Sequence, residues 1–299
     1  MSGLFQGFDE TLVDVDGHAI LARVGGAGPP LLLVHGYPQS SAMWHRVAPQ
    51  LAQQYRVIAP DLPGYGRSDA SRADVARYAK RRLGRDMVAL MAQLGHGRFA
   101  VCGHDRGGRV AYRMALDHPA TVAALCVVDI VPTGAIWSEL NARQAMAMYH
   151  WMFLAQPAPL PERLIDADPN GYMRHTLASW TGTGDLTAFD EAALAEYLKA
   201  YADPARVHAA CQDYRAGATI DYDDDAETRR QGATIIAPTL LVHGRGIATS
   251  GKRTPLEIWR EFAPNVEGKA LSCGHFVAEE DPEGLLGALV PFLERHVLR

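Results

Sequence analysis

The chain has 299 residues with a formal net charge of −5; 48% of the residues are hydrophobic and 21% are charged. This balance is typical of a folded globular protein and excludes an intrinsically disordered or collagen-like chain. The acidic balance argues against nucleic acid as a partner, and we interpret the short basic run at residues 80–82 as a solvated helix face.

The first part of the chain alternates between strand and helix patterns. Alternating residues at 11–15 and 19–24 flank Asp16-Gly17 and predict a β-hairpin. Continuous apolar runs then predict buried strands with helical patterns between them. The strands are expected at residues 31–34, 56–59, 99–102 and 124–128, and the helices at 41–53, 78–94 and 108–117. This order predicts an α/β fold with βαβ units and a mostly parallel sheet flanked by helices.

From about residue 132 to residue 232 the strand patterns stop. Helical patterns at 140–153, 191–202 and 204–214 surround a Pro-rich break at 156–161. The alternation then resumes, with strands at 239–243 and 269–271 and helices at 255–262 and 282–296. We therefore expect a core of residues 1–131 and 233–299 and an inserted helical cap of residues 132–232. Such a cap covers the carboxyl ends of the strands, where open parallel sheets bind ligands.

The cellular setting is predicted from what the sequence lacks. The first ten residues show no basic start followed by an apolar core, and no apolar stretch reaches about 18 residues, so we expect neither a signal peptide nor a membrane partner. The four cysteines, Cys102, Cys126, Cys211 and Cys273, form no CxxC pair. We expect buried free thiols in a reducing cytoplasm.

The segment Gly103-His104-Asp105-Arg106-Gly107 follows an apolar strand and precedes a helix. Glycines two residues before and after a central residue are typical of a nucleophile elbow, which usually holds Ser. Here the central residue is Asp105, which excludes a serine esterase; the alternative is a helix N-cap in a glycine-rich turn. A carboxylate nucleophile attacks an sp³ carbon and forms an alkyl ester, which suits carbon–halogen bonds and epoxides.

An ester on Asp105 must then be hydrolysed by activated water. His275 lies after the last predicted strand, where α/β-hydrolase triads place their general base. Asp129 ends the apolar run 124–128, where an unpaired charge is costly, and it is either the partner of His275 or a capping residue. The backbone N–H groups of Tyr37 and Arg106 are expected to form the oxyanion hole.

These motifs resemble the fluoroacetate dehalogenases, a branch of the haloacetate dehalogenases in the α/β-hydrolase superfamily. The resemblance covers nearly the whole chain, and its cap segments are the most specific part. It rests on HGYPQSSAMWHRVAP, DLPGYGRSD, GHDRGGRVAYRMALDHP, VVDIVPT, YHWMFLAQPAPLPE, DYRAGA and SCGHF. The family implies Asp105 as nucleophile, His275 as base and Asp129 as its partner.

The resemblance also assigns binding residues. It implies Arg106 and Arg109 as a clamp for the substrate carboxylate, which agrees with the bidentate grip that arginine offers. It implies His150, Trp151 and Tyr214 as the halide pocket; without it, Arg109 reads as a surface helix residue and residues 149–151 as core packing. Trp180 is a further candidate for the pocket wall.

The activity implied is hydrolysis of a haloacetate, expected to be fluoroacetate, to glycolate and halide by a homodimer. Neither a metal nor an organic cofactor is expected, and the chain holds no HExxH motif.

Two alternatives from the residues stay open. An epoxide hydrolase shares the Asp elbow, the HGxP loop and the cap, and would use two cap tyrosines, for which Tyr149 or Tyr214 are candidates. Arg106 argues against it because a neutral epoxide needs no arginine clamp, and haloalkane dehalogenases have Trp at this position. A non-catalytic binder with the same fold is the other alternative, although it could lose any triad residue freely and all three are present.

Overall fold

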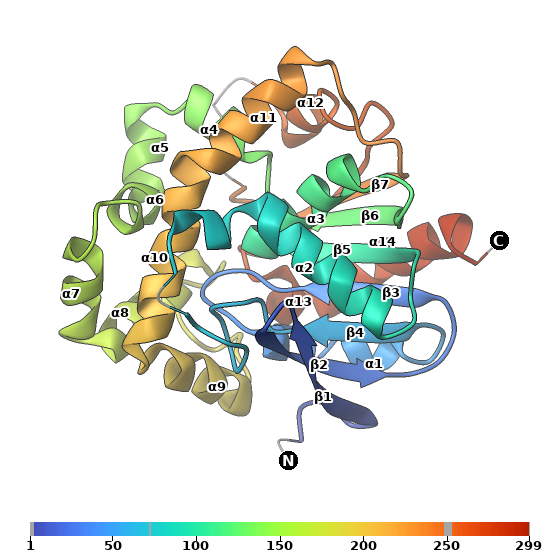
Figure 1. Ribbon diagram of the computed structural model, residues 1–299, viewed down its shortest axis with the longest axis horizontal. Helices are drawn as coiled ribbons and strands as arrows, with labels where there is room; N and C mark the ends of the chain where they lie inside the picture. Colours follow the sequence, from blue (N-terminus) through green and yellow to red (C-terminus); the bar gives the residue numbers. More distant parts are fainter. Residues whose placement is uncertain (1–2, 72, 248–252, 299) are drawn as a thin grey trace.

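The computed structural model describes residues 3–71, 73–247 and 253–298. Eight strands form one sheet in the order β1-β2-β4-β3-β5-β6-β7-β8 (Figure 1). Strands β3 to β8 run parallel, whereas β1 and β2 pair antiparallel with each other and β2 pairs antiparallel with β4. The strands are β1 (Phe8–Val15), β2 (His18–Gly25), β3 (Pro30–Val34), β4 (Arg56–Pro60), β5 (Phe99–His104), β6 (Val122–Val128), β7 (Thr239–His243) and β8 (Glu267–Ala270).

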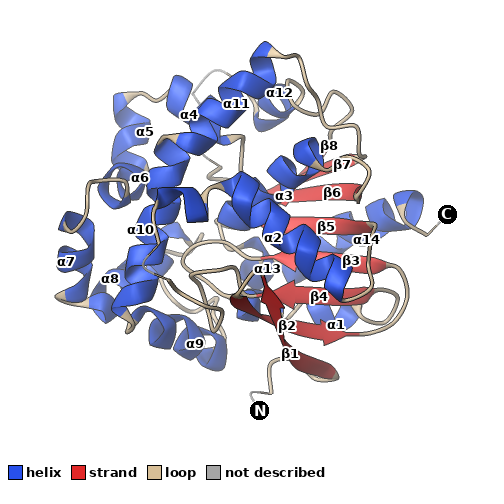
Figure 2. Cartoon of the chain, in the orientation of Figure 1, coloured by secondary structure: helices blue, strands red, loops and turns tan. Residues whose placement is uncertain are grey.

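The central strands β3 to β7 are buried on both faces, as their continuous apolar runs predict. Successive side chains alternate between the faces: Leu32 and Val34 belong to one core cluster, and Leu31 and Leu33 to the other. Helices α2 and α3 cover the first face, and α1 and α14 cover the second (Figure 2). The helices of this part are α1 (Ala48–Leu51), α2 (Lys80–Gln93), α3 (Asp105–Asp117), α12 (Pro255–Trp259), α13 (Val277–Glu280) and α14 (Pro282–His296), with 3₁₀ turns at Ser41–Trp44 and Val75–Tyr78.

The predicted hairpin is confirmed. Val15 pairs with His18, and the two turn residues Asp16 and Gly17 have φ angles of 53° and 81°. Two consecutive positive φ angles are what a two-residue hairpin turn requires.

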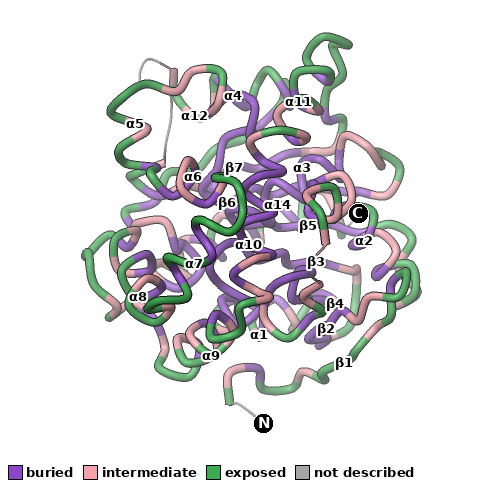
Figure 3. The backbone as a smooth tube through the Cα atoms, turned by 60° about the vertical axis from the view of Figure 1, so that its left-hand side comes forward, coloured by how far each residue is buried: buried purple, intermediate pink, exposed green. Residues whose placement is uncertain are grey.

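The chain between β6 and β7, all of which the structure describes, forms eight helices and no strand. These helices lie beyond the carboxyl ends of the parallel strands, with outer turns of α8 and α9 exposed and the strands β5 and β6 buried (Figure 3). They are α4 (Thr133–Ser138), α5 (Ala142–Ala147), α6 (Tyr149–Leu154), α7 (Leu160–Asp166), α8 (Pro169–Trp180), α9 (Glu191–Tyr201), α10 (Pro204–Ala218) and α11 (Ile220–Arg230).

Several helix predictions are corrected by the structure. The helix expected over 41–53 is a 3₁₀ turn followed by the single turn α1, because Pro49 lacks the N–H that a continuous helix needs. The helix expected over 140–153 is divided at Met148 into α5 and α6. The sequence did not predict α4, α7, α8 or α11.

Lys80 is not part of a solvated face. Its side chain is buried and pairs with Asp213 and Asp221, whereas Arg81 and Arg82 are partly exposed as expected.

The four cysteines are free and buried, as predicted. Within the described residues, every helix is too short or too polar to cross a membrane.

Candidate active site

The nucleophile elbow is formed where β5 passes directly into α3. Asp105 is the first residue of the helix rather than lying three residues before it, and its φ angle is +46°. A non-glycine residue rarely adopts this left-handed conformation, and such strain is concentrated at functional sites. A Cβ at Gly103 would lie 2.5 Å from the carbonyl oxygen of Gly107, and one at Gly107 would lie 2.2 Å from that of His35. The turn therefore requires both glycines.

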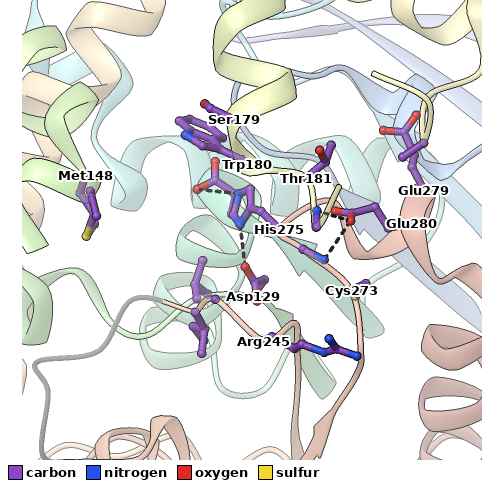
Figure 4. Close-up of a pocket in the computed structure, with 18 of the residues that line it drawn as sticks. Asp129, Met148, Ser179, Trp180, Thr181, Arg245, Cys273, His275, Glu279 and Glu280 are labelled. Atoms are coloured by element: carbon purple, nitrogen blue, oxygen red, sulfur yellow. Dashed lines mark hydrogen bonds and ion pairs between the residues drawn. The ribbon is translucent and has the colours of Figure 1, made fainter. Parts of the chain in front are cut away.

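Three predicted triad residues meet at the carboxyl ends of the strands. Asp105 follows β5, Asp129 follows β6, and His275 lies in the loop after β8. His275 Nδ1 lies 2.6 Å from Asp129 Oδ2 (Figure 4). The other oxygen of Asp129 accepts the N–H of Gly244 at 2.8 Å. His275 Nε2 lies 3.9 Å from Asp105 Oδ2, so the imidazole is oriented by one carboxylate and faces the other.

The two oxygens of Asp105 have different surroundings. The backbone N–H of Tyr37, in the loop after β3, donates to Asp105 Oδ1 at 2.8 Å. The second oxyanion donor expected from the sequence, the N–H of Arg106, makes no hydrogen bond to this carboxylate among the described residues. Oδ1 is thus held by a backbone donor, whereas Oδ2 faces His275.

The charges around the site favour an ionised nucleophile and a basic imidazole. Burial alone would raise the pKa of Asp105, but the positive charges of His275, His104, Arg106 and Arg109 lower it below its ordinary value. Burial alone would lower the pKa of His275, but its hydrogen bond to Asp129 and the negative charges of Asp129 and Asp105 raise it. The geometry therefore provides a carboxylate beside a base.

Arg106 is paired with an acidic residue of the protein, Asp213. Its Nε donates to Asp213 Oδ1 at 2.5 Å, and its Nη2 donates to the Asp213 carbonyl at 2.7 Å. Lys80 Nζ also pairs with Asp213 Oδ1 at 2.7 Å, and the Arg106 guanidinium lies 4.4 Å over the ring of Tyr214. Its Nη1 is buried without a hydrogen-bond partner. The charge of Arg106 is thus balanced by an acid on α10, and one donor is left over.

Arg109 forms no such ion pair among the described residues, although the nearby charge of Asp105 favours its charged form. Its Nη1 donates to the Val131 carbonyl and to Thr133 Oγ1, each at 3.0 Å, and its guanidinium lies 4.7 Å over the ring of Trp151. Its Nε is buried without a partner, and within the described residues Arg109 forms no ion pair, although only 3% of the residue is exposed. Burial and the charge of Arg106 lower the pKa of Arg109. A buried cation without an ion pair is costly.

The predicted halide residues come together from two cap helices. His150 and Trp151 lie on α6 and Tyr214 on α10, and the Tyr214 ring contacts both at centroid distances of 5.7 and 6.3 Å. His150 Nδ1 and the Tyr214 hydroxyl are buried without hydrogen-bond partners. Burial lowers the pKa of His150 to about 3, so its ring is neutral at physiological pH. Trp180 lies 4.3 Å from His150 between centroids, as a wall residue would.

A cavity of about 840 Å³ lies between the strand ends and the cap helices. Asp105, Arg109, Asp129 and His275 line it together with His150, Trp151 and Trp180, whereas Arg106, Tyr37 and Tyr214 do not. No group of three or more His, Cys, Asp or Glu side chains among the described residues is arranged to hold a metal ion.

Comparison with known proteins places this geometry in a family. A family model described as the alpha/beta hydrolase fold matches residues 29–282. The chain belongs to the α/β-hydrolase family. A fluoroacetate dehalogenase from Burkholderia sp. is 42% identical over 293 residues, which cover 97% of this chain and 95% of that protein. A soluble epoxide hydrolase from Corynebacterium sp. (strain C12) is 32% identical over 281 residues, which cover 93% of this chain and 94% of that protein.

A solved structure of a candidate α/β hydrolase from Nostoc sp. PCC 7120 is 45% identical to this α/β hydrolase. It superposes with a TM-score of 0.91 and covers 96% of this chain and 98% of that chain. The predicted fold and the family resemblance are therefore confirmed. Because dehalogenases and epoxide hydrolases are both among the relatives, the family alone does not choose the substrate.

Three acidic residues that matter in this α/β hydrolase were not predicted. Asp213 holds Arg106, and Glu279 is buried in the cavity wall, where burial raises its pKa to about 8. Glu280 accepts hydrogen bonds from the backbone on both sides of His275. Asp213 stands in the quoted DYRAGA motif and Glu279-Glu280 follows the SCGHF motif, which is the signal that could have drawn attention to them.

Proposed function

We propose that this α/β hydrolase cleaves the carbon–halogen bond of a haloacetate, with fluoroacetate as the expected substrate, and releases glycolate and halide. The observation that carries the proposal is Arg109, a buried cation without an ionic partner among the described residues, on the wall of the cavity that Asp105 also lines. A small anionic substrate supplies the missing charge. A neutral substrate would leave the guanidinium without an ion pair.

In the first step Asp105 Oδ2 attacks the α-carbon of the substrate. A carbon–oxygen bond forms, the carbon–halogen bond breaks, and the halide leaves with the bonding electron pair. Arg109 pairs with the substrate carboxylate and offsets its repulsion of Asp105. Arg106, the second residue of the proposed clamp, does not line the cavity and offers only its unpartnered Nη1. The hydrogen bond from Tyr37 to Oδ1 leaves Oδ2 as the attacking atom.

In the second step His275 Nε2 takes a proton from water, and the water oxygen attacks the ester carbon of Asp105. The Tyr37 N–H stabilises the negative charge that develops on Oδ1, and Asp129 stabilises the imidazolium. The bond between the Asp105 carbonyl carbon and Oδ2 then breaks. Glycolate leaves with Oδ2 and takes the proton from His275. The water oxygen stays in Asp105, and the second water proton is released to solvent as the carboxylate is restored.

Fluoride is strongly hydrated, so its departure needs donors that replace water. We propose that His150, Trp151 and Tyr214 supply them, because two of these side chains have buried, unpartnered polar atoms. The neutral state of His150 makes it a donor through an N–H rather than a permanent counter-ion.

An epoxide hydrolase is the second candidate, favoured by the epoxide hydrolase relative and by the unpartnered hydroxyl of Tyr214. Of the two cap tyrosines considered for it, Tyr149 is 39% exposed, and neither tyrosine is among the residues that line the cavity. A neutral epoxide would also form no ion pair with Arg109.

The test is halide release from purified protein given fluoroacetate or chloroacetate, measured with ion-selective electrodes, with Asp105→Asn as control. We expect release from the wild type and none from Asp105→Asn. Styrene oxide is offered in parallel, and ring opening without halide release would replace this proposal with the epoxide one.

We also propose that residues 132–232 act as the cap over the core formed by 1–131 and 233–299. The homodimer and the cytoplasmic location stay predictions.

A further inference from the structure

Glu280, on α13, accepts three backbone hydrogen bonds with one carboxylate. The N–H of Gly182, after cap helix α8, donates to Oε2 at 2.7 Å, and the N–H of Gly274 donates to the same oxygen at 2.9 Å. The N–H of Phe276 donates to Oε1 at 2.9 Å. Glu280 lies between the chain that carries Thr181 and the loop that carries Cys273 (Figure 4). It therefore joins the cap to both residues that flank the proposed base.

The two backbone segments that Glu280 joins are in direct contact. The N–H of His275 donates to the carbonyl of Trp180 at 2.9 Å. A Cβ at Gly274 would lie 2.3 Å from the nitrogen of Gly182, so the close approach requires glycine there. The end of α8 and the His275 loop are thus packed backbone against backbone.

This packing fixes the main chain from which the imidazole extends. Hydrogen bonds hold the N–H of His275 and the N–H groups of both its neighbours. The hydrogen bond to Asp129 then sets the remaining orientation of the ring. The Trp180 ring packs edge-on against the His275 ring at 5.5 Å between centroids. The position of the base therefore depends on the cap as well as on the core.

The nucleophile is held by other interactions, although the ring of His104, the residue before it, lies 2.8 Å from the carbonyl oxygen of His275. Asp105 is held by its elbow and by the Tyr37 N–H, and none of the hydrogen bonds of Glu280 reaches either residue. Removal of the Glu280 carboxylate therefore disturbs the group needed in the second step and leaves the group needed in the first step in place.

We propose that Glu280 is a positioning residue that fixes His275 against the cap and so sets the rate of ester hydrolysis without setting the rate of halide displacement. This proposal rests on the proposed two-step function. Glu280→Gln keeps the size of the side chain but replaces one acceptor oxygen by a donor that opposes the backbone N–H groups. Misplacement of a reacting group by about 1 Å costs up to about 100-fold in rate.

The experiment is rapid-quench measurement of halide release from the full chain, with mass spectrometry of the quenched protein. In Glu280→Gln we expect a halide burst near one per active site at the wild-type rate, then turnover slowed by about 10- to 100-fold with the ester accumulating. Glu283→Gln, an exposed acid three residues further on, is the matched control and should behave as wild type.

The outcomes separate the two proposals. If Glu280→Gln slows both steps equally, or neither, while the wild type turns over, the positioning role is wrong. If the wild type releases no halide from any haloacetate, the proposed function fails and the positioning role falls with it. The amplitude of the halide burst measures the number of folded active sites. If Glu280→Gln does not fold, Glu280→Asp, which keeps the charge, is used for the same comparison.

Discussion

Replacement of Arg109 by Gln tests the link between an unpaired buried charge and an anionic substrate. In the free protein the Arg109 guanidinium donates to two neutral acceptors, the Val131 carbonyl and Thr133 Oγ1, and forms no ion pair among the described residues. If its charge serves the substrate carboxylate, its removal should weaken binding and catalysis of the anion without unfolding the protein.

The size of the effect follows from the hydrogen bond that the substitution removes from the substrate carboxylate. A hydrogen bond to a charged group contributes about 1.5–3 kcal/mol. Since about 1.4 kcal/mol corresponds to a factor of ten, kcat/KM for chloroacetate should fall by about 10- to 150-fold in Arg109→Gln. Removal of the hydrogen bond to Val131 is offset by removal of a buried charge, so the free energy of unfolding should change by less than about 2 kcal/mol. Breaking a buried ion pair instead costs about 3–5 kcal/mol.

The assay compares chloroacetate with chloroacetamide, which has the same leaving group but no charge. Halide release by wild type and Arg109→Gln is measured for both substrates, together with urea unfolding of each protein. The decrease in rate should be confined to the charged substrate. Equal decreases for the acid and the amide, or a drop in stability as large as that of a broken ion pair, would refute the assignment of Arg109 to the substrate carboxylate.

The remaining predictions concern pH, stability and halide choice. His275, whose pKa is raised, must lose its proton to act as base, whereas Asp105, whose pKa is lowered, stays ionised in acid; kcat should therefore fall in mildly acidic buffer while the halide burst persists, and a joint fall of both would contradict the scheme. Asp213→Asn removes the buried counter-charge of Arg106 and Lys80 and should lower the free energy of unfolding by about 3–5 kcal/mol in urea; wild-type stability would speak against a structural ion cluster. Tyr214→Phe removes an unpartnered hydroxyl and should leave Tm unchanged while reducing fluoroacetate turnover more than chloroacetate turnover; equal reductions would remove Tyr214 from the fluoride site.

The core of the fold was predictable because its signals are local. Strand β5 is buried throughout, so its apolar run marks it, and the glycines around Asp105 mark the turn that follows. Asp129 and His275 were found for the same reason, because each stands just after a strand of the sheet. Parallel strands bring such positions to one edge, and the structure places the two side chains within hydrogen-bond distance.

The cap was less predictable because its helices are stabilised by interactions with distant parts of the chain. Helix α11 is largely polar, and one of its buried anchors is Asp225, which pairs with Arg113 at 2.7 Å and accepts a hydrogen bond from Tyr112 at 2.7 Å. Such a helix has no apolar face from which the sequence could predict it. The ion pair that neutralises Arg106 was also not predictable, because its partner Asp213 is 107 residues away. The family resemblance implied the same role for Arg106 and Arg109, whereas of the two only Arg109 lacks an ionic partner among the described residues.

The central claim is that Asp105 forms a covalent ester which His275 then hydrolyses. Intact-mass measurement of His275→Asn incubated with fluoroacetate, followed by peptide mapping, tests it most directly. We predict that the protein gains one carboxymethyl group and that the peptide containing Asp105 carries it. An unmodified mass after long incubation, with a wild-type sample that releases fluoride in parallel, would contradict the two-step account.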